Sequence, residues 1–137
     1  DVLATAGAPE PQAVLLGGMG GTWVPWTRLG GMSVDPWELR AAGLSLGAGI
    51  VHLLPKGRDG LQESVAILDW LAEQSARQCG PCIFGLPALA DAVRRTARGR
   101  DGGEAQRISD LISGRGACRH PDGAVRMAMS AQEVFGS

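Results

Sequence analysis

The sequence predicts an α+β protein of 137 residues, with a mainly β first part and a helical second part. Two observations predict this division. Short apolar runs bounded by Gly and Pro occupy residues 1–58, and such runs are typical of strands. From residue 59 onward, apolar side chains recur every three or four residues, which is the period of an amphipathic helix. We therefore expect two domains, 1–58 and 59–137, that meet near residues 56–60.

Three apolar runs in the first part are predicted strands: residues 13–16, 22–26 and 50–54. Glycines at 17, 18, 20 and 21 separate the first two runs, and Gly47 and Gly49 precede the third, which stops at Pro55. Gly permits tight turns and Pro cannot continue a central strand, so these residues are natural strand boundaries. One short helix is expected near residues 35–42.

Four helices are expected in the second part, over about 61–77, 86–97, 104–113 and 121–135. Each carries one apolar stripe. In the last helix, Pro121 suits the first turn because its missing N–H costs nothing there, and Asp122 suits the positive end of the helix dipole. Because the connections are short, we predict that the four helices form an antiparallel bundle.

Charge and cysteine content restrict the possible functions. Lys and Arg number 13 against 14 Asp and Glu, which argues against nucleic acid or an anionic membrane surface as a partner. No apolar run approaches the roughly 20 residues that span a bilayer, so we expect no direct membrane insertion. Three cysteines are an odd number, and two of them form C-x-x-C. This pattern favours the reducing cytoplasm, with thiols kept for metal or redox chemistry.

The segment Cys79-Gly80-Pro81-Cys82 is compatible with two chemistries. At a helix N-terminus it could act as a redox dithiol, since the dipole lowers the pKa of the thiol. A thioredoxin-like site needs a strand leading into the motif, however, and residues 72–78 are polar and in phase with a helix. Alternatively, the two thiols could bind an iron–sulfur cluster together with Cys118, which lies in a second glycine-rich loop.

Two further interpretations of these residues remain open. A zinc site would need a fourth ligand, and His120 is available two residues after Cys118. Cys118 could also be a small buried residue without a metal, as free cysteine often is.

The chain resembles the C-terminal part of the NADH-oxidising flavoprotein of NADH-quinone oxidoreductase, the respiratory complex I. That family carries S-C-G-x-C-x-P-C-R-x-G-x-P and, later, G-x-x-x-C-x-x-x-D. Residues 75–87 (SARQCGPCIFGLP) are similar to the first motif and residues 114–122 (GRGACRHPD) to the second. Residues 14–21 (VLLGGMGG) and 45–51 (SLGAGIV) are similar to the glycine signatures of the family's soluble-ligand-binding β-grasp (SLBB) module. The resemblance implies an incomplete SLBB-like β-grasp module followed by a four-helix iron–sulfur domain.

The resemblance implies that Cys79, Cys82 and Cys118 are ligands of the cluster. Family members hold a [4Fe–4S] cluster with four cysteines, and Ala76 stands at the first of these positions. The Arg that follows the third family cysteine is Ile83. Three thiolates could hold a [3Fe–4S] cluster, or a [4Fe–4S] cluster whose fourth iron takes His120, Asp122 or water. The remaining alternative is that the cluster has been lost.

We therefore expect an electron-transfer module or subunit of an NADH- or flavin-linked oxidoreductase, in which Ile83 and Phe84 shield the cluster from water. Its expected partners are other subunits or domains of a redox complex, flavoprotein or ferredoxin-like, and its expected location is the cytoplasm, at the periphery of a membrane redox complex. The family's FMN- and NADH-binding domain is absent from these residues, so no hydride chemistry is assigned. The alternatives are a thiol-disulfide oxidoreductase using Cys79 and Cys82 and a cofactor-free scaffold.

Overall fold

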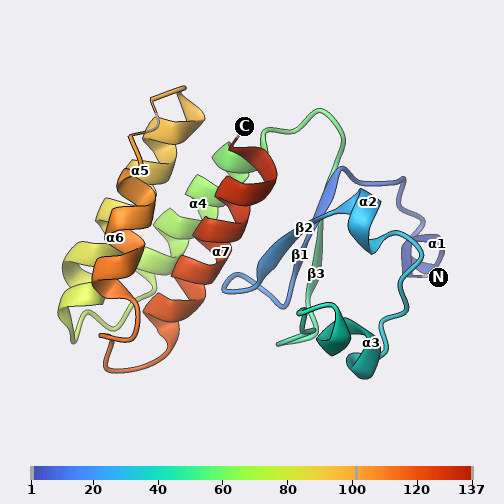
Figure 1. The fold of residues 1–137 in the computed structure, drawn as a ribbon, viewed down its shortest axis with the longest axis horizontal. Helices are drawn as coiled ribbons and strands as arrows, with labels where there is room; N and C mark the ends of the chain where they lie inside the picture. The colour runs from blue at the N-terminus through green and yellow to red at the C-terminus, as the bar shows by residue number, and fades with distance from the viewer. Residues whose placement is uncertain (1, 101, 137) are drawn as a thin grey trace.

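The computed structural model describes residues 2–100 and 102–136. They form an α+β fold in which a small antiparallel sheet lies beside a group of helices (Figure 1). The strands are β1 (Ala13–Leu16), β2 (Thr22–Pro25) and β3 (Val51–Leu54), in the spatial order β2-β1-β3. The three predicted strands are confirmed. Gly17 and Gly18 both have positive φ in the β1–β2 turn, a conformation that side-chain-bearing residues rarely adopt.

The central strand β1 pairs on both sides, and all four of its residues are buried. Because successive side chains point to opposite faces of a sheet, β1 contributes to two apolar clusters. Ala13 and Leu15 join a core that also contains Trp23 and Leu54 and continues into the helices. Leu16 belongs to a second cluster, with Leu39 and Leu44, on the opposite face.

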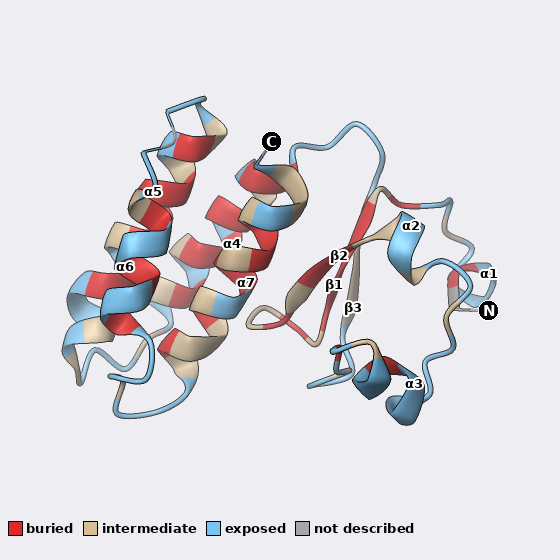
Figure 2. Ribbon diagram, viewed as in Figure 1, coloured by how far each residue is buried: buried red, intermediate tan, exposed pale blue. Residues whose placement is uncertain are grey.

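All four helices expected in the second part are confirmed: α4 (Gly60–Glu73), α5 (Leu86–Ala97), α6 (Glu104–Ile112) and α7 (His120–Phe135). A short π-helical turn, η1 (Pro81–Gly85), leads into α5. Their buried residues face one another and leave the outer faces exposed (Figure 2). Whether this arrangement is the family's four-helix bundle stays a prediction.

In the first part, α3 (Pro36–Ala41) confirms the short helix expected there. The Asp35 carboxylate caps it by accepting from the N–H groups of Trp37 and Glu38. Two one-turn helices, α1 (Val2–Ala6) and α2 (Trp26–Leu29), were not expected. Such short helices contain too few residues to show a 3.6-residue period.

The end of α4 differs from the prediction. The helix begins as expected, since Asp59 accepts hydrogen bonds from the N–H groups of Leu61 and Gln62. It ends at Glu73 rather than near Arg77. Arg77 has φ = 53°, the only positive φ of a non-glycine residue in the described part of the chain. A left-handed residue cannot continue a right-handed helix, so the predicted end was wrong.

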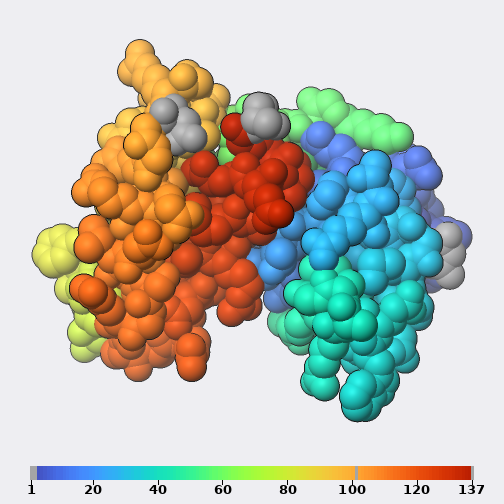
Figure 3. All heavy atoms as spheres, viewed as in Figure 1, coloured from blue at the N-terminus to red at the C-terminus, as the bar shows by residue number. Residues whose placement is uncertain are grey.

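Helix α7 joins the sheet to the other helices. The buried N–H of Trp23 in β2 donates to Ser130 Oγ at 2.9 Å, and Ser130 in turn donates to the carbonyl of Met127. The rings of Trp23 and Phe135 meet edge to face, with centroids 5.2 Å apart. In space-filling view, the red atoms of α7 abut the blue atoms of the sheet part across the middle of the molecule (Figure 3).

One continuous core therefore spans both sides of the proposed boundary at residues 58 and 59. The division into two domains and the assignment of the first part to an SLBB-like β-grasp stay predictions. No helix in the described ranges has the length and apolar character needed to cross a membrane.

Replacing Ser130 with Ala should lower the free energy of unfolding by about 1–3 kcal/mol, because the buried N–H of Trp23 would lose its acceptor. Urea denaturation followed by circular dichroism measures this change. Ser109→Ala is the matched control, since the buried Ser109 hydroxyl has no hydrogen-bond partner among the described residues. Equal losses in the two variants would contradict the role given to Ser130.

Candidate functional site

The C-x-x-C segment forms the tight turn between α4 and α5. The carbonyl of Cys79 accepts hydrogen bonds from the N–H groups of Cys82 and Ile83, and the chain continues as the π turn η1. Gly85 lets α6 approach this turn, because a Cβ at that position would lie 2.5 Å from Ile112 Cγ2. Cys82 is 5% exposed, whereas Cys79 is half-buried. The turn is therefore held from both ends by packed helices.

The loop between α6 and α7 carries Cys118, and its position depends on Asp122. The carboxylate of Asp122, in the first turn of α7, accepts from the N–H of Gly114 at 2.8 Å and lies 3.3 Å from Arg119 Nη1. Helix α7 begins at His120, with Pro121 in its first turn as predicted. Both cysteine-bearing loops lie at the same end of the helices, at the lower left of Figure 1.

The structure brings the three predicted cysteines near one another. The N–H of Ala117, next to Cys118, donates to Cys79 Sγ and lowers the pKa of that thiol; the N–H and the thiol of Cys82 also donate to it. Burial raises the pKa of Cys82, and the charges of Cys79 and Cys118 contribute in the same direction. Cys118 is exposed rather than turned into the core, so it is not the buried structural cysteine that one interpretation allowed.

Ser75 is a neighbour of this site that the sequence did not single out. Its hydroxyl donates to the carbonyl of Ala72 at 2.8 Å, and it also forms a hydrogen bond with Cys82 that opposes the rise in the pKa of this thiol. Ser75 stands at the serine of the family motif, so the sequence contained a signal for it. The contact with Cys82 itself depends on the early end of α4.

His120 lies beside α4. Its Nε2 is 2.8 Å from the carbonyl oxygen of Leu71, an arrangement in which the ring N–H donates to the carbonyl. Within residues 2–100 and 102–136, no three side chains of His, Cys, Asp or Glu are close enough together to bind one metal ion. The zinc site that the sequence allowed is therefore not formed there, and His120 as a ligand stays a prediction.

The distances between ligand sulfurs differ between an iron–sulfur cluster and a single metal ion. Thiolates that share one zinc, each about 2.3 Å from the metal, must nearly touch one another. Thiolates around a [4Fe–4S] cluster surround a larger object and lie further apart. The thiols of Cys79 and Cys82 lie within hydrogen-bonding distance of each other, and the binding of a cluster by Cys79, Cys82 and Cys118 stays a prediction. The chain has three cysteines, so it supplies no fourth thiolate.

The side chains expected to cover the site are largely exposed. Phe84 is 74% exposed and Ile83 is 44% exposed, and their role as a shield of a cluster against water stays a prediction. The π turn directs them outward because Cys82 and Gly85 occupy its buried side.

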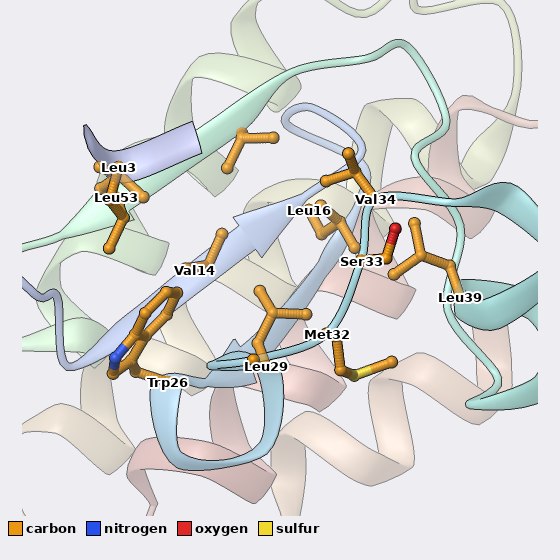
Figure 4. A pocket seen from close by; sticks show the side chains of 12 residues that line it. Leu3, Val14, Leu16, Trp26, Leu29, Met32, Ser33, Val34, Leu39 and Leu53 are labelled. Atoms are coloured by element: carbon orange, nitrogen blue, oxygen red, sulfur yellow. The ribbon is translucent and has the colours of Figure 1, made fainter. Parts of the chain in front are cut away.

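A cavity on the far side of the sheet is a second concave feature. It has a volume of about 400 Å³ and is lined mainly by apolar side chains, including Val14, Trp26, Leu29, Met32 and Leu53 (Figure 4). The close-up shows these side chains converging between β1, α2 and the segment before α3. Among the described residues, Ser33 supplies the one hydroxyl on its wall. The cavity offers apolar contact and little that could orient a polar ligand.

The dithiol alternative gains no support from the fold. Cys79 follows the end of α4 and a short connection, not a strand, and the sheet lies beside α7 instead of leading into the cysteine motif. The arrangement thus defines a class of protein: an α+β fold with a three-cysteine site at one end of its helices.

Comparison with family models assigns the chain more closely. The model described as the NADH-ubiquinone oxidoreductase-F iron–sulfur binding region matches residues 63–137, which is more than half of the chain. The chain belongs to this family. The match contains both cysteine loops and begins within α4, so it does not extend to the sheet. No curated protein shows a significant match to the chain.

Replacing Arg77 with Gly should stabilise the protein by up to about 1 kcal/mol. The left-handed conformation costs a residue with a side chain about 1–2 kcal/mol, and the greater freedom of Gly in the unfolded chain offsets part of the gain. Gly is also the residue of the family motif at this position. Arg77→Ala is the control, because it removes the guanidinium but keeps the Cβ. A similar gain from Arg77→Ala in urea denaturation would contradict backbone strain as the cause.

The metal-free protein should lose stability in acid, because protonation removes the stabilising charge of Asp122. The N–H of Gly114 lowers the pKa of Asp122, and Arg119 adds to this effect. A lowered pKa in the folded state gives stability that is present above the unfolded value of about 3.9 and is lost as the pH falls through the folded value. Asp122→Asn should therefore lower the unfolding midpoint at pH 7 and have a smaller effect below about pH 4.

Glu133→Gln is the control for this pH dependence, since Glu133 is an exposed carboxylate on the same helix. Thermal unfolding of the three proteins across the pH range provides the comparison. A destabilisation by Asp122→Asn that is constant from pH 7 to acid would contradict the role of the charge.

Proposed function

We propose that this chain is an iron–sulfur electron-transfer module of an NADH- or flavin-linked oxidoreductase, with Cys79, Cys82 and Cys118 as the protein ligands of the cluster. The observation that carries the proposal is the match of residues 63–137, which contain both cysteine loops, to the iron–sulfur binding region. The N–H of Ala117, which the Cys118 loop directs at Cys79 Sγ, supports it. A bound cluster would supply one-electron redox chemistry, which no arrangement of these side chains provides alone.

The protein's part in this function is to set the environment of the sulfurs. The N–H groups of Ala117 and Cys82 both donate to Cys79 Sγ. Hydrogen bonds to cluster sulfurs raise the reduction potential, because they stabilise the more negative reduced state. The two loops thus hold the thiols together and tune them at the same time.

The same end of the molecule suits a redox partner. Ile83 and Phe84 are exposed beside Cys82, and the exposed Arg77, Arg115 and Arg119 flank the cysteine loops. Carboxylates lie there too, since Asp69, Glu73 and Asp91 line the cavity beside Cys82. Exposed apolar side chains among charges of both signs suit a protein surface of complementary charge. The partner we propose is a flavoprotein or ferredoxin-like subunit or domain of a redox complex, which receives or donates the electron here.

Anaerobic reconstitution with ferrous iron and sulfide tests the proposed function. The chain should gain broad visible absorption and about three or four iron atoms per molecule. Cys82→Ser and Cys118→Ser should each abolish most of the bound iron, while His52→Gln, in β3, should leave it unchanged. Circular dichroism verifies that every variant is folded. A folded wild-type chain that stays colourless and free of iron would sink the proposal.

A further inference from the structure

We infer that Cys79 and Cys82 form a reversible disulfide when the metal-free chain meets a small disulfide such as glutathione disulfide, while Cys118 stays a free thiol. This inference goes beyond the proposed function and needs no bound cluster. Its basis is the contact between the two sulfurs, in which the Cys82 thiol donates a hydrogen bond to Cys79 Sγ. A thiol-disulfide enzyme needs a surface that binds its substrate, whereas a disulfide within one turn needs only that its two sulfurs meet.

The backbone of the C-x-x-C turn already has the span of a disulfide. The N–H of Cys82 donates to the carbonyl of Cys79 at 3.2 Å. A hydrogen bond between residues three apart closes a tight helical turn, whose rise of roughly 1.5–2.0 Å per residue leaves the two Cα atoms about 5–6 Å apart. Cα atoms that a disulfide joins lie about 4.4–6.8 Å apart. The bond can therefore form by rotation of the two side chains, without unwinding η1.

The two thiols differ in access, and this difference sets the order in which they react. Cys79 is half-buried, whereas Cys82 is 5% exposed. The cavity beside Cys82 is lined by three carboxylates and one guanidinium, those of Asp69, Glu73, Asp91 and Arg77. Arg94 pairs with Asp69 and Asp91, and the carboxylates still outnumber the guanidinium groups there. This wall repels an anion such as glutathione disulfide, so the first attack comes from Cys79.

The reaction is a pair of thiol-disulfide exchanges. The Cys79 thiolate attacks one sulfur of glutathione disulfide, so that a bond between Cys79 and glutathione forms, the original S–S bond breaks and one glutathione leaves. Cys82 then releases its proton to the buffer and attacks the Cys79 sulfur, and the second glutathione leaves as a thiolate that takes up a proton. Overall, two cysteine thiols are oxidised, and one glutathione disulfide is reduced to two glutathione thiols.

The disulfide makes the cysteine site respond to the redox state of its surroundings. A reducing compartment keeps thiols free, so the pair closes when small disulfides accumulate. A sulfur that is held in a disulfide is no longer a thiolate and cannot bind iron. The oxidised chain is therefore unable to take up a cluster, a consequence that rests on the proposed function.

Incubation of the folded, metal-free chain with glutathione disulfide tests the inference, with alkylation of the remaining thiols and mass spectrometry as the measurement. The three free thiols of the wild type should fall to one, and peptide mapping should find the alkyl group on Cys118. Cys82→Ser should stop at a mixed disulfide between Cys79 and glutathione, whereas Cys118→Ser should lose both of its thiols. Dithiothreitol should restore every thiol, and circular dichroism verifies that each variant is folded.

The inference is overturned if the wild type keeps three alkylated thiols, if it stops at a glutathione adduct, or if the disulfide includes Cys118. Reconstitution with ferrous iron and sulfide separates this result from the proposed function. The oxidised chain should bind no iron until dithiothreitol is added, and iron uptake by the oxidised chain would contradict the closed state. If the disulfide forms and the reduced chain binds no iron, only the proposed function fails. If the reduced chain binds iron and no disulfide forms, only the inference fails.

Discussion

The site depends on one contact between two loops, in which the N–H of Ala117 reaches the sulfur of Cys79. This contact brings Cys118 beside a C-x-x-C turn from which α5 and α6 separate it in sequence. It forms because Asp122, at the start of α7, holds the N–H of Gly114 and so fixes the path of the loop. The pKa values of Cys79 and Cys82 are thus set by backbone N–H groups, by burial and by the neighbouring thiols, while Asp122 acts on the position of the loop.

The sheet contributes to the site indirectly, through α7. Ser130 and Phe135 contact Trp23, and near the first turn of the helix Gly123 lies against Gly20, where a Cβ on Gly20 would come within 3.2 Å of the Gly123 backbone. Both ends of α7 are therefore fixed against the β part, and the first turn of the helix sets the position of the Cys118 loop. Because the apolar core continues through this contact, the β part is a structural support of the cysteine site.

The elements with strong local patterns could be predicted from the sequence. Apolar runs between Gly and Pro gave β1, β2 and β3, and periodic apolar side chains gave α4 to α7. The end of α4 could not be predicted, because Arg77 adopts a conformation that its own side chain disfavours and that the surrounding structure must impose. Contacts such as Ser75 with Cys82, or His120 with Leu71, join separate elements, and no local pattern encodes them.

The loop before Cys79 differs from the family motif at one position that supplies a ligand and at one that affects the backbone conformation. Relative to the family motif, Ala76 removes a thiol and Arg77 replaces a glycine, yet Arg77 still adopts the left-handed conformation that glycine would accept freely. The surrounding contacts must therefore outweigh the local preference of Arg77. The Ser75 hydroxyl bond to Ala72 and the hydrogen bonds at Cys79 are the contacts that bracket this loop. The left-handed turn at Arg77 thus forms in a loop with no thiol at Ala76, and the contacts of Ser75 and Cys79 are what hold the two ends of this loop.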